Sequence, residues 1–391
     1  MADRWRPAWA DIDLDAVRHN AGLLADLVAP AALCAVVKAD GYGHGELAVA
    51  RAALEGGARW LAVALVEEGV TLREAGIEAP ILVLSEPPLV GMAEAVARRL
   101  VPTVYTVGGI RALSRAVADG DHPPVSVHLK VDTGMHRVGA HPDDALTLAE
   151  DITADPHLEL GAVWTHLAVA DGADAEDRAF TSLQLDRFDT VVASLAAVGL
   201  RPPMTHVANS AGTIGWPASR HDMVRCGLAV YGMAPTPSLA TALEAATGGS
   251  LTPVLSLRSQ VTYVRELAAG ERPSYGRRRP LPADATVATV PIGYADGVPR
   301  RLFDQGGAVL IGGMRRPLAG VVTMDQIVVD CGPAGSVPVA VGDEVVLIGR
   351  QGSEEITAGE WADLLGTISY EVLCDIGPRV PRLVHGERPP G

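Results

Sequence analysis

A small set of polar residues stands where apolar segments of the chain end, and their types suit a definite chemistry. In AVVKADGYGHG (residues 35–45), Lys38 closes an apolar run just before a turn with three glycines in five residues. Others follow at or near the ends of later apolar runs: Lys130, Asp132, His166, Asn209, Ser210 and Arg225. A lysine amine that loses its hydration becomes a nucleophile toward aldehydes, while hydroxyl groups and glycine-rich backbone bind phosphate.

The elements that must position these side chains alternate regularly. Short β-branched runs occur at residues 33–38, 60–65, 80–85, 101–106, 125–132, 158–168, 204–209 and 222–232. Between them lie segments with helical periodicity, including residues 46–57, 92–100, 143–152 and 183–199. Eight strands separated by helices predict an α/β barrel of the (β/α)8, TIM type, with an open doubly wound sheet as the alternative.

In such a barrel, the carboxyl ends of the strands form one mouth, which holds the active site. The polar residues named above would therefore converge there. A desolvated lysine beside phosphate-binding hydroxyl and N–H groups suits a ligand that carries both an aldehyde and a phosphate. Pyridoxal 5'-phosphate (PLP) carries both, and the sequence predicts it as cofactor.

The second part of the chain has a different pattern of predicted secondary structure. After residue 240, strand-like runs are separated by Gly, Pro and Asp turns, with little helical periodicity before residues 360–366. We therefore predict a PLP-binding barrel domain over residues 1–240 and a mainly β C-terminal domain over residues 241–391. Residues 9–14 (WADIDL) read as an extra strand preceding the barrel.

Composition excludes several classes of partner. The 32 Lys and Arg residues against 47 Asp and Glu give a formal net charge of −15, which disfavours nucleic acid and anionic membranes. No signal peptide or membrane span is recognisable, and four separated cysteines read as reduced, buried thiols, so a cytoplasmic protein is expected. The 11 histidines lack metal-binding spacing, so no metal is expected.

Nine segments, in this order and over nearly the whole length, together resemble bacterial alanine racemase: AVVKADGYGHG, KVDTGMHRVG, THLAVAD, HVANSAG, VRCGLAVYG, SYGRR, PIGYADG, TMDQ and ISYEVLCDIGPRVPR. The resemblance implies a PLP-dependent isomerase that interconverts L- and D-alanine and supplies D-alanine for peptidoglycan precursors. It also implies a barrel followed by a β domain, and a homodimer whose active sites are shared between subunits.

The same resemblance implies roles for individual residues. Lys38 and Tyr275 of the partner subunit would be the two catalytic bases, with Lys38 also forming the Schiff base. The other cofactor-binding residues would be Tyr42, His166, Ser210, Arg225, Gly227 and Tyr370. Arg137 and Met324 would bind substrate, Lys130 and Asp325 would support them, and Tyr294, Arg300 and Asp171 would line the substrate's access route.

Local alternatives stand beside these roles. A free phenol ionises near pH ~10, so Tyr275 would need support, for which His166 is the candidate. Arg225, a donor facing the pyridine nitrogen, could instead be a strand arginine paired with Asp222. Lys130, which is often carbamylated in the family, could instead pair with Asp132.

The sequence departs from the family pattern at a few positions. GVVTMDQ has Val321 where the family usually has arginine, and Ser369 stands where asparagine is common. These changes open the question of a serine side activity.

Two other functions are alternatives to the racemase. A decarboxylase of the same architecture would usually have an acidic residue facing the pyridine nitrogen, and a non-catalytic PLP carrier would lack the β domain.

Overall fold

The computed structural model describes residues 5–335 and 338–388, which form two compact units. The barrel unit comprises residues 15–41 and 46–252. The β unit comprises the N-terminal segment up to Leu14, the short segment Tyr42–Gly45, and the chain from Pro253 onward. Within the described residues, no helix is both long and apolar enough to cross a membrane.

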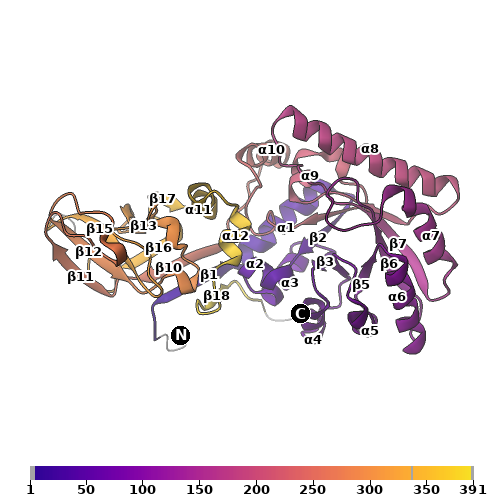
Figure 1. Cartoon of the computed structure of the whole chain (residues 1–391), viewed down its shortest axis with the longest axis horizontal. Helices are drawn as coiled ribbons and strands as arrows, with labels where there is room; N and C mark the ends of the chain where they lie inside the picture. Colours follow the sequence, from indigo (N-terminus) through magenta and orange to yellow (C-terminus); the bar gives the residue numbers. More distant parts are fainter. Residues whose placement is uncertain (1–4, 336–337, 389–391) are drawn as a thin grey trace. The chain divides into compact units, whose positions relative to one another are not determined.

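Eight parallel strands close into a barrel, which confirms the predicted fold class (Figure 1). They are β2 (Ala32–Val36), β3 (Trp60–Val63), β4 (Ile81–Val83), β5 (Val101–Val104), β6 (Val125–Lys130), β7 (Leu158–Trp164), β8 (Met204–His206) and β9 (Met223–Cys226). Pairing of β2 with β9 closes the ring. Strands buried on both faces carry continuous apolar sequence, and β2 (ALCAV) is buried at all positions after its first.

Helices follow the barrel strands and cover them (Figure 1). The helices of this part of the chain are α1 (Leu14–Val28), α2 (Lys38–Gly43), α3 (Glu46–Glu55), α4 (Val66–Glu74), η1 (Leu89–Gly91), α5 (Met92–Ala97), α6 (Val107–Asp119), η2 (Pro142–Asp144), α7 (Ala145–Ala154), α8 (Ala175–Ala197), α9 (Ser210–Gly215), η3 (Pro217–Ser219) and α10 (Pro237–Thr247). The last predicted strand, residues 222–232, ends early at Cys226. Its remaining residues are apolar because they form a buried turn.

The β unit holds two antiparallel sheets with one parallel pair. Its strands are β1 (Ala8–Asp13), β10 (Leu255–Gln260), β11 (Tyr263–Leu267), β12 (Ala285–Val290), β13 (Ala308–Ile311), β14 (Met314–Pro317), β15 (Ile327–Pro333), β16 (Glu344–Gln351), β17 (Glu354–Ile356) and β18 (Arg382–His385). Its helices are η4 (Tyr275–Arg277), η5 (Tyr294–Asp296), η6 (Arg300–Leu302), α11 (Ala358–Leu365) and α12 (Ser369–Cys374).

The extra N-terminal strand exists, but it belongs to the sheet of the β unit. β1 lies between β10, its antiparallel neighbour, and β18, its parallel neighbour. Its side chains alternate between buried and partly exposed, as expected for a sheet with one covered face.

The predicted domain boundary at residue 240 differs from the division between the compact units, which falls after Thr252. The Asn20 side chain, on α1, donates to the Thr252 carbonyl (2.8 Å) and accepts from its N–H (2.8 Å), so α10 and the following segment stay with the barrel. The cysteines also differ from expectation in one case: Cys34, Cys226 and Cys331 are buried, whereas Cys374 is exposed.

Candidate active site

Lys38 stands where the chain leaves the barrel wall. The prediction placed it at the end of a strand, but β2 ends at Val36 and Lys38 begins α2. The five residues after it, 39–43, all have positive φ, with values of 54, 52, 60, 53 and 77°. A left-handed conformation costs roughly 1–2 kcal/mol for each residue other than glycine, so glycines at 41 and 43 lower the cost of this turn. The turn thus redirects the chain immediately after the lysine.

Arg225, on β9, is the buried centre of the barrel's polar interior. Its Nη1 donates to His206 Nδ1 at 2.7 Å. Its Nη2 donates to the carbonyls of Thr165 (2.8 Å) and Val207 (2.9 Å) and lies 3.3 Å from His166 Nδ1. Asp222, the alternative partner, instead accepts from the N–H and hydroxyl of Thr205, so that alternative is not what the structure shows.

The charge of Arg225 survives its burial. Desolvation lowers the pKa of Arg225 to about 10, so the guanidinium remains protonated at neutral pH. The neighbouring imidazoles remain neutral, because burial and the charge of Arg225 hold the pKa of His206 and of His166 well below the usual value and lower that of His128 to about 3.

The guanidinium also fixes the tautomer of the imidazole beside it. A guanidinium can only donate, so His206 Nδ1 accepts and its proton is on Nε2, which donates to His128 Nδ1 at 3.1 Å. Trp164 forms one wall of this cluster: its ring stacks on His206, and Arg225 Cζ lies 4.4 Å from its centroid. Arg225 is therefore held in a single orientation as a permanent hydrogen-bond donor.

Lys130 is the second lysine of the cluster, and the chain contains no lysines besides it and Lys38. Its Nζ lies 4.4 Å from the centroid of the Trp164 ring. Burial lowers the pKa of Lys130 to about 7, and the charges of Arg225, Arg137 and Lys38 contribute to the decrease while Asp132 opposes it. The same three charges act on His166. Lys130 and Arg225 both lie against the Trp164 ring, and Arg225 reaches His166, so the fold brings these three predicted residues together.

Ser210 and Gly227, both predicted to bind phosphate, lie close together. Ser210, buried at the start of α9, accepts hydrogen bonds at Oγ from the N–H groups of Gly227 (3.1 Å) and Ala229 (3.3 Å). A hydroxyl group can accept two hydrogen bonds and still donate one, so Ser210 remains a donor. Asn209 caps α9 by accepting from the N–H of Gly212 at 2.9 Å, so it shapes the start of this helix.

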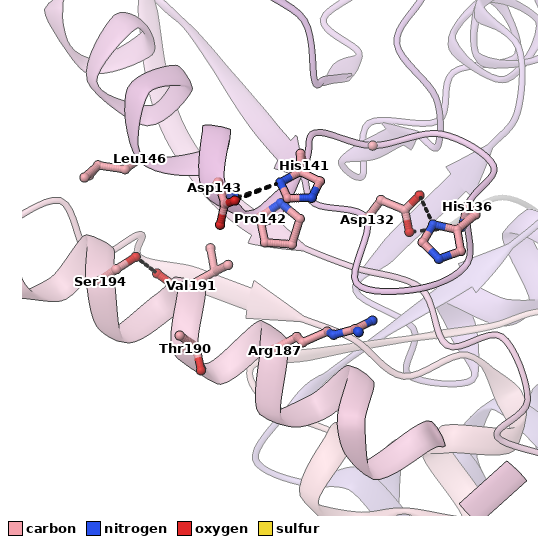
Figure 2. Close-up of a pocket in the computed structure, with 11 residues that line it drawn as sticks. Asp132, His136, His141, Pro142, Asp143, Leu146, Arg187, Thr190, Val191 and Ser194 are labelled. Atoms are coloured by element: carbon pink, nitrogen blue, oxygen red, sulfur yellow. Dashed lines mark hydrogen bonds and ion pairs between the residues drawn. The ribbon is translucent and has the colours of Figure 1, made fainter. Parts of the chain in front are cut away.

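Arg137 lies in a loop between β6 and η2 that is fastened at several points. Asp132 Oδ1 accepts from the N–H groups of Gly134 (2.9 Å) and His136 (3.0 Å), so Asp132 organises this loop. Arg187, on α8, donates to the Thr133 carbonyl at 2.9 Å. Figure 2 shows a pocket beside this loop, where His136 faces Asp132 and Arg187 extends from α8. Asp171, expected to line the access route, is exposed in the loop before α8.

The remaining predicted residues belong to the β unit. Tyr42 is buried, and its ring centroid lies 6.0 Å from that of Tyr370, so these two predicted phosphate ligands lie close together. Tyr275 is on the short turn η4 and is 70% exposed. Ser274 Oγ donates to the Val321 carbonyl at 2.6 Å, and a Cβ atom on Gly320 would collide with Ser274. The turn that presents Tyr275 is therefore fixed although its tip is exposed.

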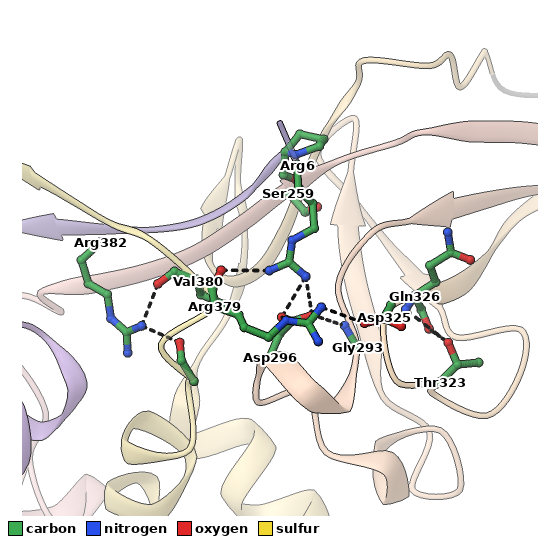
Figure 3. A network of polar contacts seen from close by, with 12 residues as sticks. Arg6, Ser259, Gly293, Asp296, Thr323, Asp325, Gln326, Arg379, Val380 and Arg382 are labelled. Carbon is green, nitrogen blue, oxygen red and sulfur yellow. Dashed lines mark hydrogen bonds and ion pairs between the residues drawn. The ribbon is translucent and has the colours of Figure 1, made fainter. Parts of the chain in front are cut away.

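Tyr294 is on η5, and Met324 is on the adjoining turn of residues 323–326, called here the Met324 turn; Figure 3 shows the residues around them. The N–H of Tyr294 donates to the Thr323 carbonyl (2.9 Å) and that of Ala295 donates to the Met324 carbonyl (3.1 Å). Arg300 Nη1 donates to the Val322 carbonyl at 3.0 Å, which connects a third predicted residue to the same turns.

Sequence reasoning missed Trp164, His206 and His128 as parts of the Arg225 cluster, and Asp296 and Arg379 beside the Met324 turn. A signal existed for His128, which lies two residues before Lys130 on one strand. Alternate residues of a strand face the same side, so this histidine had to point where the lysine points.

The sequence matches two family descriptions: "Alanine racemase, N-terminal domain" over residues 12–235 and "Alanine racemase, C-terminal domain" over residues 254–384. The chain belongs to the alanine racemase family. An alanine racemase of Symbiobacterium thermophilum is 47% identical over 98% of this chain and 99% of its own length. One of Salinispora arenicola is 41% identical over 97% of this chain and 98% of its own.

Solved structures of alanine racemases give the same result. The enzyme from a D-cycloserine-producing Streptomyces lavendulae is 37% identical, with a TM-score of 0.90 over 99% of both chains. The Bacillus anthracis enzyme with bound L-Ala-P is 35% identical, with a TM-score of 0.89 over 98% of this chain and 96% of that one.

The residues of this family member fit PLP by their chemistry. Lys38 offers an amine, Ser210 a hydroxyl donor and Arg225 a charged donor for a ring nitrogen, while the neutral His166 places no second cation beside Arg225. Tyr42 and Tyr370, which lie close together in the β unit, carry phenolic hydroxyl groups.

Proposed function

We propose that this protein interconverts L- and D-alanine with PLP as cofactor. The observation that carries the proposal is the cluster around Arg225, in which this buried, fixed donor and the amine of Lys130 both lie against the Trp164 ring. The family assignment gives the reaction, and this cluster supplies a permanent hydrogen-bond donor and a lysine amine. When bound, PLP supplies an aldehyde for the substrate amine and a ring that draws electrons away from Cα.

Arg225 would hold the pyridine nitrogen of the cofactor as a donor. Its pKa of about 10 keeps the guanidinium protonated, so it cannot take up a further proton. A ring nitrogen that receives a hydrogen bond without a proton is a weaker electron sink than a pyridinium, which limits side reactions such as transamination. Ser210, Tyr42, Tyr370 and the N–H of Gly227 would bind the phosphate.

Racemisation removes a proton from one face of Cα and delivers one to the opposite face, so it needs two groups. We infer that Lys38 serves one face and the phenol of Tyr275, from a second copy of the chain, serves the other. A homodimer with shared sites is supported by the exposure of Tyr275 (70%), Met324 (51%) and Tyr294 (41%), which are fixed in position but extend from the surface of a single chain.

Lys130 would act on the substrate through Arg137. With a pKa of about 7, a large share of its amines are neutral at physiological pH and can attack CO2. A C–N bond forms, one proton leaves the nitrogen, and the resulting carbamate is an anion that could orient Arg137 toward the substrate carboxylate.

This role of Lys130 predicts a pH-dependent signal. Carbon-13 NMR of the protein in labelled bicarbonate should show a carbamate at pH 8 that disappears as pH falls below about 7, because the amine becomes protonated. Lys130→Ala should lack the signal and have a KM for alanine raised roughly fivefold or more. A signal of equal size in Lys130→Ala would assign the carbamate elsewhere.

The enzyme would supply D-alanine for peptidoglycan precursors in the cytoplasm.

Val321 stands where the family usually has arginine, so a charge is missing near the turn that holds Tyr275. We infer that L-serine is accepted as a slower substrate.

The test of the function is proton NMR of L-alanine, and separately of L-serine, with PLP-loaded protein in D2O, followed by chiral analysis. We expect loss of the α-proton signal and formation of D-alanine, with serine exchanging more slowly. Bound PLP without exchange or inversion of either amino acid would refute the racemase. Ornithine, arginine and diaminopimelate would then be tested for decarboxylation.

A further inference from the structure

Asp296 is a fully buried carboxylate that no step of the proposed mechanism uses. It lies in the β unit at the end of η5, two residues after Tyr294, and its side chain is 0% exposed. Isolated buried carboxylates are strongly unfavourable, so such a residue must be paired. Its partners show which part of the unit depends on it.

Asp296 receives bonds from three directions, as Figure 3 shows. Nη1 of Arg6 contacts both carboxylate oxygens at 2.8 Å. The N–H of Gly293 donates to Oδ2 at 3.0 Å, which closes the η5 turn. Nε of Arg379 lies 3.2 Å from Oδ1. Arg6 Nη2 also donates to the Arg379 carbonyl at 3.0 Å, so both arginines are fixed to one another and to the carboxylate.

Arg379 links Asp296 to the Met324 turn. Its Nη2 donates to Asp325 Oδ1 at 2.7 Å, so one guanidinium joins the buried Asp296 to an exposed residue adjacent to Met324. The backbone gives a second connection, because the N–H groups of Tyr294 and Ala295 donate to the carbonyls of Thr323 and Met324. The two turns are tightly packed against each other, because a Cβ atom on Gly293 would lie 2.3 Å from the Thr323 oxygen.

We propose that Asp296 is a positioning residue which, through Arg379 and the η5 turn, fixes the Met324 turn and Tyr294 in the orientation that receives the substrate. The inference rests on the proposed function and on the expectation, drawn from the family resemblance, that Met324 binds the substrate. Because Asp296 is fully buried, it would touch neither substrate nor cofactor. Its loss should therefore weaken capture of a carboxylate while leaving proton transfer by Lys38 and Tyr275 largely intact.

The first experiment is Asp296→Asn, which keeps the shape but removes the charge that holds two arginines. We expect the KM for both alanine isomers and the inhibition constant of propionate, a carboxylate without the amine, to rise about tenfold, with kcat changed by less than about threefold. Asp11→Asn is the matched control. Asp11 is an aspartate of the same unit, paired with Arg258 at 3.0 Å, and belongs to a different ion-pair group.

A second measurement does not depend on catalysis. In hydrogen–deuterium exchange, peptides covering residues 292–297 and 322–326 should lose protection in Asp296→Asn and keep it in Asp11→Asn. Unchanged protection would overturn the inference whatever the activity. Altered protection with an unchanged KM would overturn its link to substrate, provided that the wild type racemises alanine. A wild type that does not racemise alanine would refute the proposed function and leave exchange as the deciding test of positioning.

If Asp296→Asn fails to fold, the proposal can be tested instead at Arg379 and Asp325, the partly exposed residues of the same network. Arg379→Ala and Asp325→Ala should each raise the KM severalfold. The double variant should have a KM no higher than the worse single variant, because both substitutions remove the same contact between Arg379 and Asp325. Independent, multiplying effects would contradict the proposal.

Discussion

Lys38→Ala should abolish covalent attachment of PLP at the active site and lower alanine racemisation by at least about 10³-fold, because it removes the amine that would form the Schiff base and serve one face of Cα. Lys130 is fixed against the Trp164 ring, and the chain has no third lysine. The measurement is borohydride reduction of the PLP-loaded protein, mass spectrometry of the labelled peptides, and chiral assay of alanine.

The composition of the chain makes this experiment decisive. A trapped label can reside on Lys38, on Lys130 or on the N-terminal amine, so each outcome identifies its site. Arg59→Ala, which removes an exposed cation just before β3 at the opposite end of the barrel, should label and racemise like the wild type. Undiminished labelling in Lys38→Ala would show that the wrong lysine had been assigned.

Tyr275→Phe should lower racemisation by about 100-fold or more, since it removes the hydroxyl group of one of two proton-transferring groups. The two isomers are equal in free energy, so kcat/KM must fall alike in both directions. The asymmetry should appear in exchange with D2O. D-alanine should still lose its α-proton through Lys38, whereas L-alanine, which needs Tyr275, should not. Tyr263→Phe, at another exposed tyrosine of the same unit (55%), is the control.

Mixing the two inactive variants tests whether the sites are shared. A heterodimer of Lys38→Ala and Tyr275→Phe chains contains one site with both native groups, so part of the activity should return. Equal exchange of both isomers by Tyr275→Phe would contradict the assignment of faces, and absence of recovery in verified heterodimers would indicate single-chain sites.

The sequence by itself determined the barrel, the mainly β second part and the position of most polar residues near strand ends. These features are local: apolar strands buried on both faces and helices with one apolar stripe must repeat with their own periods. β1 shows the limit of such patterns. Its alternation correctly indicates a strand, but which sheet it joins depends on β10 and β18, which lie far away in sequence.

Charges and partners were decided only by the tertiary structure. The lowered pKa of Lys130 depends on burial and on Arg225, Arg137 and Lys38 at distant places in the chain. Asp296 acquires its importance from Arg6 and Arg379, 290 residues before it in the first case. Electrostatic and hydrogen-bond energies depend on distance and solvent exposure in three dimensions, and the spacing of residues along a chain records neither.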